Sequence, residues 1–337
     1  MKRLGSQTVK FQAPPLISAH AAVGSVMEGQ GPLCAYFDFI SNDPYFGAKS
    51  WERAESEMLK KCFELCMEKA AISPLQPDYI ISGDLLNQCV GSAFAIKDSG
   101  VPYFGLYGAC STMAESLSLA AMLLDGGYAE RVCALTSSHY CSAERQFRLP
   151  LAYGGLCSPT SQRTATAAGC LLVEAQGNGT AELTHVTTGK IIDGGISDAS
   201  NMGAAMAPAA LETLCTHFSD TGRSPEYYDL IVTGDLGAVG HSILLELAEQ
   251  QGFALSQNCK DCGMLLYDPQ KQPVHAGGSG CGCSAGVLAG YLLSEMSSGR
   301  LERLLFAATG ALMSPTTALQ GESILGICHA VAIERKG

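Results

Sequence analysis

An internal repeat constrains the fold of this chain more than any other feature of its sequence. The segment DYIISGDL at residues 78–85 reappears as DLIVTGDL at residues 229–236, with five of the eight positions identical. Equivalent residues are 151 positions apart, as Asp84 and Asp235 are. Each copy is a short apolar run that ends at a glycine and an aspartate, a pattern that predicts a buried strand. The chain therefore contains two related segments, and each begins with a strand of the same kind.

A second pair of matching blocks follows the first pair in the same order. Cys110-Ser111 opens an apolar segment that reaches Arg131 after 21 residues, and Cys283-Ser284 opens one that reaches Arg303 after 20 residues. Two matched blocks in one order are hard to produce by chance. We therefore expect two structurally related halves, residues 1–175 and 176–337.

Each half is expected to alternate strands with helices. After Cys110, four apolar residues recur at helical spacing (Ala114, Leu117, Ala121 and Leu124). The segment 112–115 fits a capping box that starts this helix, and the glycines at 126–127 end it. The segment 50–70 predicts a long amphipathic helix. This alternation predicts an α/β fold whose sheet is parallel or mostly parallel, with helices on both faces.

Composition excludes several classes of protein. The 337 residues are 47% hydrophobic and 16% charged, which argues against disorder, and the net charge of −11 argues against nucleic-acid binding. No apolar stretch reaches the roughly 18 residues that cross a bilayer, and the N-terminus has no apolar stretch of signal-peptide length. We expect cytoplasmic synthesis and, at most, peripheral membrane association. Most of the 15 cysteines are expected to be small buried side chains.

The repeat and Cys110 together resemble a known superfamily. A duplicated α/β half with a cysteine at the start of a buried helix is similar to the thiolase superfamily, and segments 101–105 and 108–111 resemble its nucleophile segment. Within that superfamily, four segments resemble the stage V sporulation protein AD family of endospore-forming bacteria. These segments are residues 51–55, 82–88, 201–210 and 326–331. The resemblance covers essentially the whole chain.

This resemblance implies a thiolase-like fold, with helices between and around central sheets. It also implies a function without catalysis. Members of the family are associated with the uptake of dipicolinic acid (pyridine-2,6-dicarboxylate) into the developing spore and its release in germination. They bind that ligand at the spore inner membrane, together with membrane proteins of the same stage V sporulation operon. Proteins of this plan usually pair across a sheet edge, so the resemblance also implies a homodimer.

Cys110 occupies the position of the family nucleophile. A thiol at the start of a helix lies near the positive end of the helix dipole, which favours the thiolate. The related enzymes supply a histidine and an asparagine or second histidine from loops of the second half. Here those loops offer Asp235 and, within residues 276–283, Ser279 and two cysteines. The thiol therefore has no obvious proton acceptor, which favours ligand binding over the alternative of a thiolase-like or ketoacyl-synthase-like acyl-transferring enzyme.

The remaining candidate ligand-binding residues are polar. Asp84 and Asp235 each end a strand at the carboxyl edge, where α/β sheets bind ligands. Each is alternatively the cap of the following helix, which we favour. Two acids beside a dianion repel it unless a calcium ion accompanies dipicolinate and bridges them. The other candidates are hydrogen-bonding residues, namely Ser111, Asn87, Gln88, His139, His275 and Ser279.

Two readings concern the other histidines and cysteines. His241 and His329 are expected to be structural, in a helix and in the closing strand 327–333. Cys259, Cys262 and the cysteines at 281 and 283 have spacings that could bind zinc. The repeat already explains the last two, so we expect no resident metal, and no cofactor besides calcium that accompanies dipicolinate.

Overall fold

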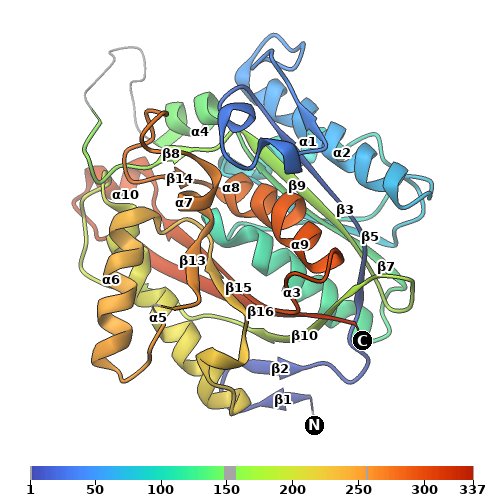
Figure 1. Cartoon of the computed structure of the whole chain (residues 1–337). Helices are drawn as coiled ribbons and strands as arrows, with labels where there is room; N and C mark the ends of the chain where they lie inside the picture. The colour runs from blue at the N-terminus through green and yellow to red at the C-terminus, as the bar shows by residue number, and fades with distance from the viewer. Residues whose placement is uncertain (1, 148–156, 256, 337) are drawn as a thin grey trace.

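The computed structural model describes residues 2–147, 157–255 and 257–336 (Figure 1). Its strands are β1 (Arg3–Leu4), β2 (Thr8–Lys10), β3 (Leu16–Gly24), β4 (Phe39–Ile40), β5 (Tyr79–Gly83), β6 (Tyr103–Gly105), β7 (Arg131–Ser138), β8 (Arg163–Thr164), β9 (Ala167–Glu174), β10 (Ala181–Thr187), β11 (Ile192–Asp193), β12 (Leu230–Thr233), β13 (Cys259–Asp261), β14 (Gly278–Ser279), β15 (Arg303–Leu312) and β16 (Leu325–Arg335). Its helices are α1 (Trp51–Lys69), α2 (Val90–Ile96), α3 (Thr112–Asp125), α4 (Tyr140–Phe147), α5 (Met202–Thr221), α6 (Gly237–Gln250), α7 (Cys262–Leu266), α8 (Cys281–Gly286), α9 (Leu293–Ser297) and α10 (Pro315–Leu319).

The main strands form two sets of five with the same order. The first set runs β6-β5-β7-β9-β3 and the second runs β13-β12-β15-β16-β10, and β10 pairs with β3 to join them. In each set the first three strands are parallel and the last two are antiparallel to their neighbours. The repeat seen in the sequence is therefore a repeat of structure.

The sheet is mixed, so the prediction of a mostly parallel sheet is wrong. The two matching sequence blocks cover only β5, β7, β12 and β15 with the helices between them, and those strands are parallel. The strands that run antiparallel to them, β9 and β16, lie beyond the matched blocks.

Helices lie between and around the strand sets (Figure 1). α3 contacts β5 and β7 of the first set and β15 and β16 of the second, so it lies in the centre of the molecule. α8 lies beside it against β9 and β7, and the π-helical turn Val287–Leu292 continues from α8 against β3 and β9. α1 and α2 cover the outer side of the first set, and α5 and α6 cover that of the second. Each layer buries an apolar face, which is the dominant favourable contribution to folding.

Asp78 and Asp229, the first residues of the two copies of the repeat, have the same structural role. Asp78 Oδ2 accepts hydrogen bonds from the backbone N–H groups of Glu130 (2.7 Å) and Arg131 (3.0 Å). Asp229 Oδ2 accepts the equivalent bonds from Glu302 (3.0 Å) and Arg303 (2.8 Å). In each half the carboxylate thus fixes the start of one parallel strand to the start of its neighbour.

The helices α1 and α3 start where the sequence predicts, but the capping interaction predicted for α3 is not formed. α1 begins after Ser50, whose side chain accepts from the Arg53 N–H. α3 begins just after Cys110 as expected, and it ends at Asp125 with Gly126 as its C-cap. Its four predicted apolar residues, Ala114, Leu117, Ala121 and Leu124, are all buried. The capping box is wrong, because Thr112 is already helical and its hydroxyl donates to the carbonyl of Ala109 (2.7 Å). A 3₁₀ turn, Ala109–Ser111, leads into the helix instead.

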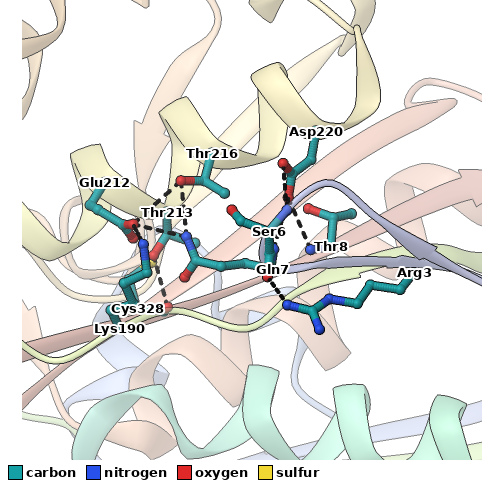
Figure 2. A network of polar contacts seen from close by, with 10 residues as sticks. All are labelled: Arg3, Ser6, Gln7, Thr8, Lys190, Glu212, Thr213, Thr216, Asp220 and Cys328. Carbon is teal, nitrogen blue, oxygen red and sulfur yellow. Dashed lines mark hydrogen bonds and ion pairs between the residues drawn. The ribbon is translucent and has the colours of Figure 1, made fainter.

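The N-terminal hairpin is held by one side chain of α5 (Figure 2). The Asp220 carboxylate accepts from the backbone N–H groups of Ser6, Gln7 and Thr8 at 2.9 to 3.1 Å. Three backbone donors on one carboxylate make a charge-assisted anchor.

The boundary between the two halves proposed from the sequence falls between β9 and β10. Within the described ranges, no helix is both long and apolar enough to cross a membrane.

Candidate functional site

Cys110 lies in a tight turn between β6 and α3. The preceding Ala109 has a positive φ of 49°, which is unusual for a residue with a Cβ. Ser111 fixes the turn from the other side, since its hydroxyl donates to the carbonyl of Gly108 at 2.7 Å. Strand β15 of the second half passes very close, because a Cβ added to Gly310 would lie 2.4 Å from the carbonyl oxygen of Gly108. The turn and the facing half together fix the position of the thiol, which is 5% exposed.

Asp235 of the second half faces this thiol. Its carboxylate makes a hydrogen bond with the Cys110 thiol. Asp235 Oδ2 also accepts from the Gly280 N–H (2.8 Å) and the Ser279 hydroxyl (3.1 Å), and Oδ1 accepts from the Thr309 hydroxyl (3.0 Å). The carboxylate is fully buried, and these donors compensate for its loss of hydration.

The thiol and the carboxylate have unusual protonation. Burial and the negative Asp235 raise the pKa of the Cys110 thiol well above its ordinary value. Burial raises the pKa of Asp235 to about 6, against the opposing effect of the hydrogen bond with Cys110. At neutral pH the thiol is therefore protonated, and it donates a hydrogen bond to the ionised carboxylate.

Two expectations about Cys110 need correction. The thiol does have a hydrogen-bond acceptor, the Asp235 carboxylate, although the loop contains no imidazole at this point. The helix dipole does not make the thiolate the favoured form, because burial and a neighbouring negative charge outweigh it. Asp235 also does not cap α6. Asp261 does so, accepting from the N–H groups of Leu236 (2.8 Å) and Gly237 (3.0 Å).

A narrow cavity adjoins Cys110. Its lining residues are Leu85, Tyr107, Ala109, Cys110, Ala143, Glu144, Phe147, Thr164, Met202, Ser279, Ala311 and Met313. Its volume of about 40 Å³ corresponds to roughly three water molecules, taking about 10–15 Å³ for each. Among the described residues, neither lysine nor arginine lines it, whereas Glu144 does. The lining of the site is therefore mostly apolar, and its charged side chain is acidic.

The other predicted aspartate, Asp84, does not line this cavity, although its neighbour Leu85 does. Asp84 is buried and accepts from the Leu86 N–H (2.8 Å) and from both the N–H (2.6 Å) and hydroxyl (2.7 Å) of Ser92. Ser92 is in the first turn of α2, so Asp84 accepts hydrogen bonds at the start of that helix. This agrees with the prediction that Asp84 caps the following helix. A second buried carboxyl, Glu55 of α1, interacts electrostatically with it.

The remaining predicted residues do not come together. Cys110 and Ser279 line the cavity and Asp235 contacts both. Asn87 and Gln88 are exposed beyond Leu85, and His275 is exposed beside the loop that carries Ser279. His139 is buried, but its Nε2 lies 2.9 Å from the carbonyl oxygen of Pro44 in a different cavity. Their role in ligand binding stays a prediction.

The two structural histidines lie where the sequence placed them. His241 is in α6. His329 is in β16, where burial lowers its pKa to about 4 and its Nδ1 accepts from the Gly189 N–H at 3.2 Å.

Three residues of the site were missed from sequence. Thr309, three residues before the end of β15, donates to Asp235, while Tyr107 and Glu144 line the cavity. Thr309 falls 74 residues from Asp235, so only the parallel pairing of β12 with β15 brings them together. An aspartate that ends one strand and a hydroxyl residue near the end of its neighbour is the signal that could have found it.

The zinc reading is not supported by the described part of the chain. Residues 2–147, 157–255 and 257–336 contain no group of three or more His, Cys, Asp or Glu side chains able to hold a metal ion. Cys262 and Cys283 are free, buried thiols, and burial raises the pKa of each well above its ordinary value.

Comparison with known proteins identifies the family. Residues 5–334 match the family described as Stage V sporulation protein AD. The protein of that name from Bacillus subtilis (strain 168) is 40% identical over 337 residues, which span 100% of this chain and 99% of the relative. The chain belongs to the stage V sporulation protein AD family. Membership in this family makes it a sporulation protein.

Solved structures show that the family has a thiolase-like fold. The 3-oxoacyl-[acyl-carrier-protein] synthase III of Aquifex aeolicus VF5 superposes with a TM-score of 0.57 at 14% identity, covering 95% of this chain and 99% of that chain. A variant of OleA from Xanthomonas campestris, crystallised with cerulenin, gives 0.60 at 11% identity, covering 96% and 97%. At such low identity the likeness concerns the fold alone. The α/β prediction, with two related halves and helices between and around central sheets, is confirmed.

Proposed function

We propose that this protein binds dipicolinic acid without transforming it. It supports uptake of that acid into the developing spore and its release in germination, as a peripheral component of a spore membrane channel complex. Family membership supports the process. One observation carries the absence of catalysis: the thiol at the nucleophile position donates to a buried carboxylate, which disfavours the thiolate that acyl transfer requires.

The charge of the site specifies the form of the ligand. Asp235 and Glu144 make the region beside Cys110 acidic, and dipicolinate is a dianion at neutral pH. Repulsion between like charges in a buried site is costly. The calcium chelate of dipicolinate is neutral as a one-to-one complex and avoids this cost, and the cavity of about 40 Å³ has to widen to admit it. The proposal therefore includes calcium as a companion of the ligand.

Calorimetry with dipicolinate, with and without equimolar calcium, tests the proposal. We expect heat of binding that is stronger with calcium. Ala143→Leu, which adds bulk to the cavity wall from α4, is expected to weaken binding at least tenfold, and exposed Cys34→Ser is the matched control. Absence of heat at millimolar ligand in both conditions would remove dipicolinate as the ligand.

Proposed partners are a second copy of the chain and membrane proteins of the same operon. β6 is the last strand of the first set and pairs only with β5 among the described strands. Phe104 in this strand is 48% exposed and nearby Tyr107 is 43% exposed. An unpaired edge with exposed aromatic side chains favours pairing with another strand. The homodimer we propose places two β6 strands side by side.

A second candidate function is acyl transfer through Cys110. It is favoured by the fold, which the chain shares with condensing enzymes, and by the cavity beside the thiol. Incubation with an acyl thioester followed by mass spectrometry separates the two functions. A thioester on Cys110, lost in Cys110→Ser, would establish the enzyme, whereas we expect no adduct.

A further inference from the structure

A second cavity lies on the other side of α4 and β8 from Cys110. Its volume is about 300 Å³, and its lining consists of Ser25, Val26, Met27, Glu28, Pro44, His139, Tyr140, Cys141, Arg163 and Thr166. Successive residues of β8 separate the two cavities, because Thr164 lines the cavity beside Cys110 and Arg163 lines this one. The second cavity thus has a larger volume than the first, and a positively charged side chain, Arg163, lines it.

Arg163 has no carboxylate partner within the part of the chain that the structure describes. Six other arginines do form ion pairs there, namely Arg53, Arg131, Arg145, Arg223, Arg300 and Arg303. Arg3 and Arg335 also form no ion pair among the described residues, but of these three arginines only Arg163 lines either of the two cavities. Its guanidinium lies 3.9 Å from the centre of the Tyr140 ring, which holds it in place by a cation–π contact.

The neighbouring polar groups are already occupied by the protein. Glu28 accepts from the N–H groups of Ser25 and Thr166 (both 3.1 Å) and from the Tyr267 hydroxyl. His139 accepts at Nδ1 from the Cys141 N–H (3.2 Å) and donates at Nε2 to the carbonyl of Pro44. These bonds leave the guanidinium of Arg163 as the strongest donor available to a ligand.

We propose that this cavity binds a small aromatic carboxylate through Arg163. A guanidinium presents paired N–H groups that match a carboxylate, and Arg163 is held by Tyr140 before the ligand arrives. Val26, Met27 and Pro44 provide apolar walls for a ring. The inference goes beyond the proposed function, which supplies only the choice of dipicolinate as one of two probes.

The single tryptophan reports on this cavity. Trp51, the one tryptophan in the sequence, lies 5.4 Å, centre to centre, from the ring of His139. Ligand in the second cavity is expected to change Trp51 fluorescence, whereas ligand confined beside Cys110 is not. Sodium benzoate and sodium dipicolinate serve as probes, with excitation where neither absorbs.

Substitutions of Arg163 test the proposal. Arg163→Met keeps the aliphatic part of the side chain and removes the charge. We expect it to weaken the fluorescence response to both probes at least tenfold, and we expect Arg163→Lys to restore part of it. Arg300→Met removes an equal charge from an arginine that pairs with Glu295 and lines neither cavity, and it should respond like the unmodified protein.

The outcomes separate this inference from the proposed function. A response of Arg163→Met equal to that of the unmodified protein, or no Trp51 response to either probe at millimolar concentration, would overturn the inference. Heat from dipicolinate without a Trp51 response would leave the proposed function standing alone. A response to benzoate with no binding of dipicolinate would leave the second cavity standing alone.

Discussion

At the scale of single residues, the pairing of Cys110 with Asp235 determines what the site can do. The acceptor beside the thiol is a buried carboxylate that also accepts hydrogen bonds from Ser279, Gly280 and Thr309. Ionisation of the thiol would place two negative charges in contact in a buried site. The geometry therefore favours a neutral thiol.

A second buried carboxyl, Glu55, has a raised pKa. The Ser142 hydroxyl donates to Glu55 Oε2 at 2.7 Å, and the Ser137 hydroxyl donates to Oε1 at 3.2 Å. Burial and the carboxylate of Asp84 outweigh these two donors and raise the pKa of Glu55 to about 8.

Glu55 predicts a loss of stability at alkaline pH. Its pKa is about 8 in the folded chain against an ordinary 4.5, so its contribution is full below about 4.5 and is lost as the pH rises through 8. Between pH 6 and 9 the free energy of unfolding should fall by on the order of 3 kcal/mol more in the unmodified protein than in Glu55→Gln. Urea unfolding measures the difference, with exposed Glu68→Gln as the control. Equal pH dependence in all three proteins would show that Glu55 is ionised in the folded state.

At the scale of elements, the repeat predicted the parallel strands and the central helix correctly. It did so because the residues that recur are those that the architecture requires, such as Asp78 and Asp229 at the strand starts. Strand directions beyond the matched blocks were wrong, since β9 and β16 carry no repeated motif and pair antiparallel with their neighbours. Local patterns predict elements, but pairing direction depends on contacts distant in sequence.

The start of α3 shows a second limit of sequence patterns. Thr112 and Glu115 have the spacing of a capping box, yet Thr112 is inside the helix and Glu115 is half-buried, which raises its pKa. The same spacing occurs within first turns, and the sequence does not show where the chain leaves the preceding 3₁₀ turn. Of the candidate site, Cys110, Asp235 and Ser279 were predictable because they lie on motifs. Thr309 was not, because strand pairing alone brings it to Asp235.

At the scale of the whole molecule, two related halves place chemistry from both at their contact. Cys110 comes from the first half, and Asp235, Ser279 and Thr309 come from the second. The chain belongs to a sporulation family and has the fold of condensing enzymes. The second cavity, on the other side of α4, is formed mainly by the first half and contains Arg163.

The reactivity of Cys110 towards iodoacetamide as a function of pH tests the central claim most directly. Peptide-resolved mass spectrometry follows Cys110 together with exposed Cys34, an internal reference in the same molecule. We expect Cys110 to react only at a higher pH than Cys34, and the midpoint of its profile to fall in Asp235→Asn, which removes the neighbouring charge. A Cys110 that reacts faster than Cys34 at neutral pH, with a profile unchanged by Asp235→Asn, would show a catalytic thiolate and contradict a site that only binds.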